Sequence, residues 1–215
     1  MKRHSCITHF FRTAFFMVSM LMLCTACMLE GDIETLRENA GLSNERSFSH
    51  ARSSAQDSAI GAEGGGAVQF MVAHRWTPAQ LNSAGVAGNL LTGVEFVGNV
   101  RAATYTVRVW RGGSGSPFNS GTLVAEIIIP TNTITEGRWH RVQLPNPVTI
   151  PTNQELWIGY HVNTPSGFPA SLCSGPANRG FGNVIFWNSQ WGTLNPQFDS
   201  NWMIRGIVES SSPSR

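Results

Sequence analysis

From residue 67 onward, apolar and polar residues alternate in short runs. In the segment TYTVRVW, which begins at Thr104, the apolar side chains fall on one face and Thr106 and Arg108 on the other. The segment LWIGYHV alternates in the same way and places Trp157, Gly159 and His161 on the polar face. A period of two with one apolar face is typical of strands in an antiparallel sheet. These segments therefore predict strands with one buried face and one wet face.

About nine such runs follow one another, separated by clusters rich in Gly, Pro, Asn and Ser, notably 111–121 and 165–183. The expected strands are 67–75, 90–98, 103–111, 121–129, 138–144, 147–151, 155–163, 183–188 and 201–209. No helical pattern separates them, and many short strands at this spacing favour a sandwich or jelly roll. We therefore predict an all-β fold, an antiparallel β-sandwich (jelly-roll-like) over residues 67–210, with 211–215 as a disordered tail.

The order and texture of these strands carry a resemblance. The segments are LLTGVEFVG, ATYTVRVWRGG, GTLVAE, WHRVQLPNPVTIP, ELWIGYHV, GPANRGFGN and NWMIRGIVE. Together they resemble the jelly-roll accessory modules of secreted and surface, adhesin-like proteins of Bacteroidetes and oral spirochaetes. The resemblance implies a non-catalytic module with a binding or adhesive role, and it implies no particular ligand.

The first 26 residues have the layout of a secretory signal. Lys2, Arg3 and Arg12 precede an apolar run of 11 residues, from Thr13 to Leu23. A basic start, a short apolar stretch and then small residues are typical of a signal peptide. The run is also shorter than the roughly 20 apolar residues of a membrane-spanning helix. We therefore expect residues 1–26 to direct export.

The residues after the apolar run resemble a bacterial lipobox. Cys24-Thr25-Ala26 precede Cys27, which is the residue expected to carry the lipid, although Cys24 stands where the pattern prefers an aliphatic side chain. An ordinary cleaved signal and an uncleaved anchor are the alternatives, and all three place the rest of the chain outside the cytoplasm. We predict attachment to the cell envelope, at the outer membrane, through a lipid on Cys27.

Residues 27–66 look different from the strands that follow. The part from 43 to 66 is rich in Ser, Ala and Gly and has few large apolar side chains. Such a composition is typical of a flexible linker. We expect 27–66 to be an anchor segment and tether outside the folded module.

Cysteine content and charge limit the chemistry of the mature chain. Cys173 is the only cysteine after Cys27, so no intramolecular disulfide is expected. Without Lys2, Arg3 and Arg12, the 15 basic residues fall to 12, all arginine, against 13 acidic residues. No basic block is present, which argues against nucleic acid as a partner.

No catalytic motif stands out. The chain has no Gly-x-Ser-x-Gly elbow, no His-Glu-x-x-His and no nominated carboxylate pair, so we expect no enzyme activity. His74, His140 and His161 are expected to be hydrogen-bonded or solvated rather than catalytic. No cofactor is expected. Asp199, beside Asn195, Ser200 and Asn201, is a weak candidate for a structural calcium ion, with a plain loop as the alternative.

The aromatic residues near 190 are the candidate binding site. Trp187 and Trp191 flank the polar turn Asn188-Ser189-Gln190, and Arg179 and Asn183 precede them. An exposed ring beside amide and guanidinium donors suits sugar recognition. The alternative is a loop folded back over the sandwich edge, with the tryptophans as its plug.

Three functions follow from these observations. The first is a surface lipoprotein that binds a host or bacterial glycan or protein. The second is a structural or assembly component of the envelope with no soluble ligand. The third is a hydrolase whose site has no recognisable motif.

Overall fold

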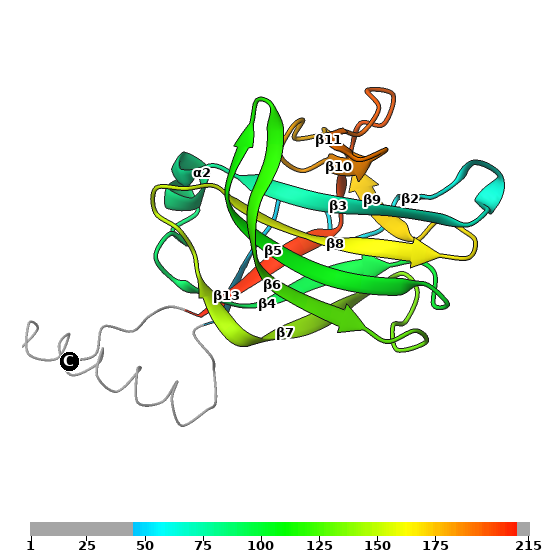
Figure 1. Cartoon of the computed structure of the whole chain (residues 1–215), viewed down its shortest axis with the longest axis horizontal. Coiled ribbons are helices and arrows are strands. Elements are labelled where there is room, and N and C mark those ends of the chain that lie inside the picture. The colour runs from blue at the N-terminus through cyan, green and yellow to red at the C-terminus, as the bar shows by residue number, and fades with distance from the viewer. Residues whose placement is uncertain (1–44, 210–215) are drawn as a thin grey trace, which may run out of the picture. The chain divides into compact units, whose positions relative to one another are not determined.

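The computed structural model describes residues 45–209. Cys27, the expected signal peptide 1–26 and the expected tail 211–215 therefore lie outside the described residues. The described part contains two antiparallel sheets that face each other, with a short helix, α2 (Pro78–Ser83), and one turn of 3-10 helix, η1 (Glu63–Gly65) (Figure 1). The predicted antiparallel β-sandwich is confirmed.

The first sheet has seven strands and contains both chain ends of the described region. Its order is β1 (Glu45–Phe48), β13 (Ile204–Glu209), β4 (Leu90–Gly98), β9 (Ala170–Ser174) and β12 (Ser200–Trp202). In addition, β2 (Ser58–Ile60) pairs with β9, and β7 (Arg138–Thr149) pairs with β4.

The second sheet has six strands. Its order is β11 (Gln190–Thr193), β10 (Val184–Trp187), β3 (Val68–Trp76), β8 (Leu156–Thr164), β5 (Thr104–Gly115) and β6 (Phe118–Ile129). Its two outer strands are therefore β11 and β6.

The core lies between the sheets and is filled by the apolar faces that the alternation predicts. Phe96 of the first sheet meets Tyr105 and Tyr160 of the second, with ring centroids 4.8 to 5.7 Å apart among the three. All three side chains are almost fully buried. Burying a large apolar side chain contributes roughly 1.5–3 kcal/mol, so these faces supply the main stabilisation of a chain without a disulfide among its described residues.

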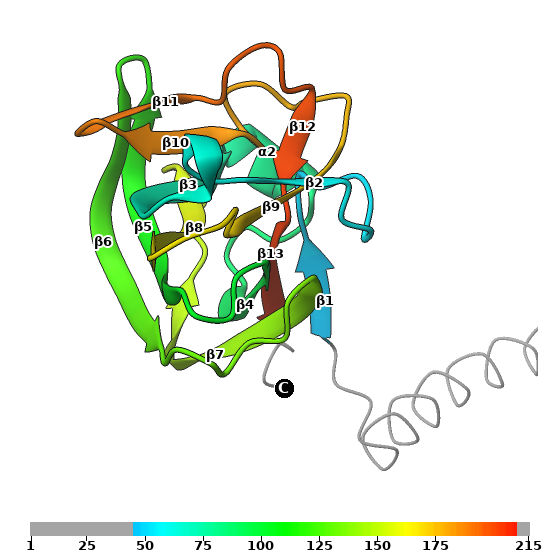
Figure 2. The same cartoon turned by 90° about the vertical axis from the view of Figure 1, so that its right-hand side faces the viewer.

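The module begins earlier than the composition of the chain predicts. Strand β1 pairs with β13, and β2 pairs with β9, so the segment from Glu45 to Ile60 belongs to the sandwich rather than to a tether (Figure 2). Phe48 and His50 are both buried. Backbone hydrogen bonds and two buried rings hold this Ser- and Ala-rich segment in place, and neither contribution depends on many apolar side chains. The expected tether is therefore wrong for residues 45–66.

The outer face of the six-stranded sheet also departs from the prediction. Trp157 is fully buried there, in a second apolar cluster with Ala73, Trp110 and Val184. The hairpin formed by β5 and β6 extends past the body of the sheet (Figure 1). Phe118 of this hairpin and Trp191 of β11 pack against the cluster. Part of the predicted wet face is thus covered by aromatic side chains.

Strand β9 and helix α2 are also absent from the prediction, as are η1 and β11. Strand β9 lies inside the expected turn region 165–183, and its residues 170–173 are buried on both faces, so they show no alternation. Helix α2 begins with a capping box in which Thr77 and Gln80 bond each other's backbone, with Pro78 in its first turn. Its single buried residue, Leu81, gives too short an apolar pattern to indicate a helix in advance.

Candidate functional site

The candidate site is built on the hairpin of β10 and β11. Trp187 pairs with Gln190, and Phe186 pairs with Trp191, across a two-residue turn. Both turn residues have positive φ, 49° at Asn188 and 64° at Ser189, which is the geometry of a type I′ turn. This turn matches the twist of a two-stranded hairpin, so it presents Asn188 and Ser189 at the tip.

The two tryptophans of the hairpin lie on opposite faces of it. Residues paired across an antiparallel ladder share a face, and neighbours along a strand alternate. Trp191 and Phe186 therefore share one face, with ring centroids 5.4 Å apart. Trp187 and Gln190 share the other. The two tryptophans thus leave opposite faces of the hairpin, although both line a small hollow at its tip.

Trp191 is a packing residue of the outer-face cluster. Its ring centroid is 5.2 Å from that of Trp157 and 5.8 Å from that of Trp110, both edge to face. Its side chain is half-buried. For this residue, the alternative in which the tryptophans plug the sandwich describes the structure better than a free binding ring.

Trp187, by contrast, is 45% exposed. Its ring and that of Phe70 make an edge-to-face contact at a centroid distance of 6.2 Å. The indole is therefore held on one side by a core residue, while nearly half of the side chain is open to solvent. A large ring that is held in position but still exposed is well suited to stacking against a ligand.

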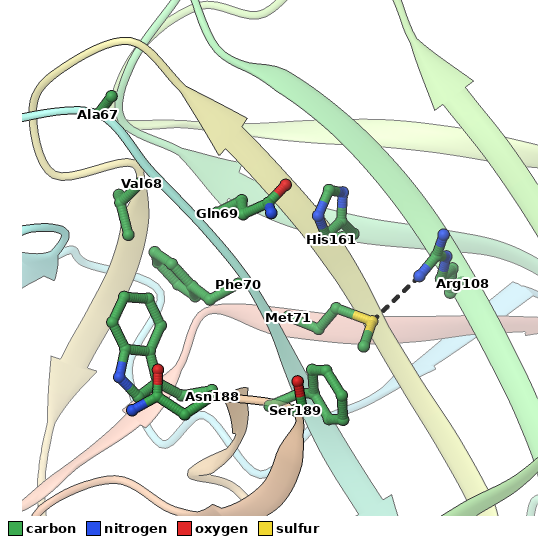
Figure 3. A pocket seen from close by; sticks show the side chains of 11 residues that line it. Ala67, Val68, Gln69, Phe70, Met71, Arg108, His161, Asn188 and Ser189 are labelled. Atoms are coloured by element: carbon green, nitrogen blue, oxygen red, sulfur yellow. Dashed lines mark hydrogen bonds between the residues drawn. The ribbon is translucent and has the colours of Figure 1, made fainter.

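A groove of about 560 Å³ opens beside Trp187. The groove lies beyond the C-terminal end of β10. Strand β10 ends at Trp187, but its antiparallel neighbour β3 extends further in that direction, from Phe70 to Val68. The polar lining residues come from three strands and the turn: Gln69 of β3, His161 of β8, Arg108 of β5, and Asn188 and Ser189. Figure 3 shows Gln69, His161 and Arg108 in a row across the sheet, with Asn188 and Ser189 across from them.

The backbone of Gln69 also faces this groove. In a regular strand, successive residues direct their N–H and C=O groups to opposite sides. Arg75 donates its backbone N–H towards the β10 side, to the Phe181 carbonyl at 2.8 Å. Gln69 has the same parity as Arg75, and the ladder between β3 and β10 ends at Met71. The backbone N–H and C=O of Gln69 therefore point to the β10 side of β3, beyond the last residue pair of the β3–β10 ladder.

The cation in the groove is held in a fixed position. Arg108 Nε donates to Glu126 at 2.6 Å, and Nη1 lies 3.1 Å from the sulfur of Met71. Burial, and to a lesser degree the positive charge of Arg108, lower the pKa of His161. His161 is therefore a neutral hydrogen-bonding group near pH 7, and the groove is polar without being strongly charged.

A second, smaller hollow of about 300 Å³ lies on another side of the same tip. Its polar lining comes from β11 and the following loop: Gln190, Thr193 and Asn195. Trp187 and Asn188 line both hollows. Of the predicted site residues, the structure therefore brings the exposed Trp187, Asn188 and Gln190 and the half-buried Trp191 together at this hollow.

The other predicted residues serve the loop before the hairpin. Asn183 is fully buried, and its side-chain oxygen accepts from the Gly180 N–H at 2.9 Å. Arg179 donates to the Pro196 carbonyl at 2.7 Å. Neither residue lines the two hollows. The prediction that Arg179 and Asn183 contact the ligand is therefore not supported by their positions.

The calcium candidate, Asp199, already bonds a backbone group. Asp199 accepts from the Ala177 N–H at 2.9 Å. Among residues 45–209, no group of three or more His, Cys, Asp or Glu side chains lies close enough to hold a metal ion. Asp199 is thus better described as part of a loop.

Two buried histidines form the other notable polar cluster. His74, which was expected to be satisfied, donates from Nε2 to the Trp202 carbonyl at 2.9 Å, and its Nδ1 accepts from the His50 N–H. His50 stacks on Trp76 with ring centroids 3.7 Å apart, bonds the Arg75 carbonyl through Nε2, and accepts from Asn178 through Nδ1. Burial lowers the pKa of His50 to about 4 and that of His74 well below its usual range. All four ring nitrogens have structural partners.

Sequence reasoning missed most of the larger groove. Gln69, Arg108 and His161 come from strands that are far apart along the chain, and each reads as an ordinary outward strand residue. The available signal was the hairpin itself: a polar Asn-Ser pair between two short aromatic runs predicts a tight turn. Ser189, which lines the groove but was not among the predicted site residues, is one of the two residues of that turn.

In the part of the chain that the structure describes, no helix has the length and apolar character needed to cross a membrane.

Comparison with known proteins is sparse. No family model matches the chain, and no curated protein matches it. Among solved structures, it is similar to the cysteine protease and lectin-like domains of Cwp84, a surface layer associated protein of Clostridium difficile. The identity is 16% and the TM-score 0.44, with 66% of this chain and 32% of that chain covered.

A second similar structure is that of infectious bursal disease virus, Gx strain. The identity is 15% and the TM-score 0.28, with 76% of this chain and 39% of that chain covered. This chain thus spans well under half the length of either. At these TM-scores neither likeness carries an argument about function, and the fold assignment rests on the strand pairing. Neither protein is from the Bacteroidetes or spirochaetes, so that resemblance stays a prediction.

Proposed function

We propose that this chain is an exported, lipid-anchored surface protein whose β-sandwich binds carbohydrate at the tip of the β10–β11 hairpin, without catalysis. The observation that carries the proposal is Trp187, 45% exposed and held by Phe70 between two hollows with polar linings. A sugar offers C–H groups on one face and hydroxyls around its rim. An indole face stacks against the first, and amide, imidazole and backbone groups bond the second.

The larger groove has the donors and acceptors that hydroxyl recognition requires. Gln69 contributes a side-chain amide and a backbone N–H and C=O of fixed direction, and neutral His161 both donates and accepts. Arg108 is already paired with Glu126. The groove is therefore better suited to a neutral polar ligand than to a strongly anionic one.

The test is a glycan array probed with the full chain, as wild type and as Trp187→Ala. We expect Trp187→Ala to weaken binding to its best glycan by at least about tenfold, as is typical of a central aromatic contact. Phe168→Ala is the matched control, because Phe168 is also 45% exposed but lies in neither hollow. Unchanged binding by Trp187→Ala, in protein with wild-type circular dichroism, would refute the assignment of this site.

A second candidate function, assembly with another envelope protein, is favoured by strand β6. This strand lies at the edge of the six-stranded sheet and exposes Ile128 at 65% and Leu123 at 44%. Apolar side chains on an open edge strand favour association. If assembly is the function, Ile128→Arg will remove the protein from its envelope complex and Trp187→Ala will not.

A further inference from the structure

The two hollows share one ring and one turn residue. Trp187 and Asn188 line both the 560 Å³ groove and the 300 Å³ hollow. Pockets that bind small ligands typically measure about 300–1,000 Å³. Each hollow therefore reaches the size of a ligand subsite by itself, and the indole of Trp187 is the boundary between them.

Besides the shared Asn188, each hollow has hydrogen-bonding groups that the other lacks. The larger groove has Gln69, His161 and the open backbone groups of Gln69. The smaller hollow has Gln190 and Thr193 of β11 together with Asn195. A single sugar ring in one hollow would leave the polar groups of the other without a ligand partner.

From this arrangement, we infer that the site binds an extended carbohydrate chain of at least two sugar residues, one in each hollow, with Trp187 as the platform between them. The inference rests on the proposed function and adds the length and course of the ligand: the chain crosses the hairpin tip over the Asn188–Ser189 turn. Since the two contacts are covalently linked through the ligand, the second binds at a high effective concentration.

An extended peptide is the competing class of ligand, because the open edge of β3 could add a strand. That edge is short. Within β3, Gln69 is the only residue beyond the last β10 pair whose backbone groups point to the open side. Strands in proteins usually have about five or six residues, so the open ladder is small compared with the two side-chain hollows. The observations favour carbohydrate.

The experiment measures how affinity depends on ligand length. Oligomers of N-acetylglucosamine, mannose and galactose, with one to four units each, compete with an immobilised tetramer for the full chain in surface plasmon resonance. We expect the best tetramer to bind at least about tenfold more tightly than its monomer. Gln190→Ala should weaken the tetramer about fivefold more than the monomer, because it removes a hydrogen-bonding group from the smaller hollow only.

Gln143→Ala is the matched control, since Gln143 is an exposed glutamine on β7 of the other sheet. Monomer and tetramer of equal affinity, with Trp187→Ala still impaired, would overturn the two-subsite inference and leave the proposed function intact. Failure of every oligomer and of the glycan array would overturn both. Trp187-dependent binding of extended peptides, with no glycan bound, would replace carbohydrate by a peptide ligand.

Discussion

The loop 175–183 and the hairpin 184–193 are neighbours along the chain, but they differ in what their amide side chains do. Those of the loop bond other groups of the protein, whereas those of the hairpin tip are exposed to solvent. In the loop, Asn183 is buried and Asn178 bonds His50. In the hairpin, Asn188, Ser189 and Gln190 are exposed. The loop is a structural element that uses amides to satisfy a compact turn, whereas the hairpin carries free polar groups around an exposed ring.

This difference has a physical cause. The loop follows strand β9 across the end of the sandwich, where its backbone groups lose water and must find partners. Asn201, which is fully buried, provides two of them: its side chain accepts from the Asn178 N–H at 2.7 Å and donates to the Pro176 carbonyl at 3.1 Å. The hairpin satisfies its own ladder, so its polar side chains remain available.

The largest effect is expected at Asn201. Asn201→Ala leaves the Asn178 N–H and the Pro176 carbonyl without their partner, at a cost of about 3 to 4 kcal/mol in the free energy of unfolding. Urea denaturation followed by tryptophan fluorescence measures it. The exposed Asn163→Ala is the control and should change the value by less than about 0.5 kcal/mol. Equal values for the two variants would show that Asn201 does not hold the loop.

The buried histidines make the inward-facing region sensitive to acid. Burial lowers the pKa of His50 to about 4 in the folded protein, while the unfolded chain keeps the ordinary value near 6.5. Between these values the unfolded state binds more protons, so the folded state loses stability as the pH falls from 6.5 to 4. This loss amounts to about 3 kcal/mol for His50 alone.

Urea denaturation at pH 7, 6, 5 and 4 tests this dependence. The His50→Phe variant keeps a ring against Trp76 but cannot bind the proton, so its stability should fall less steeply over the same range. A slope identical to that of the wild type would exclude His50 as the group responsible.

The two tryptophans of the hairpin should differ in stability effect. Trp191→Ala removes a half-buried ring that contacts Trp110, Trp157 and Phe186. We expect a loss of about 2 kcal/mol, less than for a fully buried tryptophan. Thermal unfolding monitored by circular dichroism would show it as a drop in Tm. A loss no larger than that of Trp187→Ala would mean that Trp191 is not part of the cluster.

The smallest stability effect is expected at Trp187. Trp187→Ala removes one edge contact with Phe70 and should cost less than about 1 kcal/mol. The same thermal scans measure it, with Phe168→Ala as the reference for an equally exposed ring. A loss of several kcal/mol would identify Trp187 as a core residue and would remove the basis of the binding site.

Local patterns predicted the parts of the site that are local. The apolar run from Val184 to Trp187 and the polar residues Asn188 to Gln190 after it indicated a strand followed by a turn, but not the partner strand β11. They did not distinguish Trp187 from Trp191, because the cluster that covers Trp191 is brought in by Trp110 and Phe118 from β5 and β6. The polar wall of the larger groove needed the pairing of β3, β8 and β5, which no local pattern contains.

The sequence by itself determined the fold class, since a period of two with one apolar face suits only a sheet that buries that face. Tertiary structure alone decided which polar residues are buried and which are available. His50 and Asn178 meet across 128 positions of the chain, as do His74 and Trp202. A strand pattern depends on neighbours within a few residues, whereas the burial of a polar group depends on partners that the fold brings from a distance.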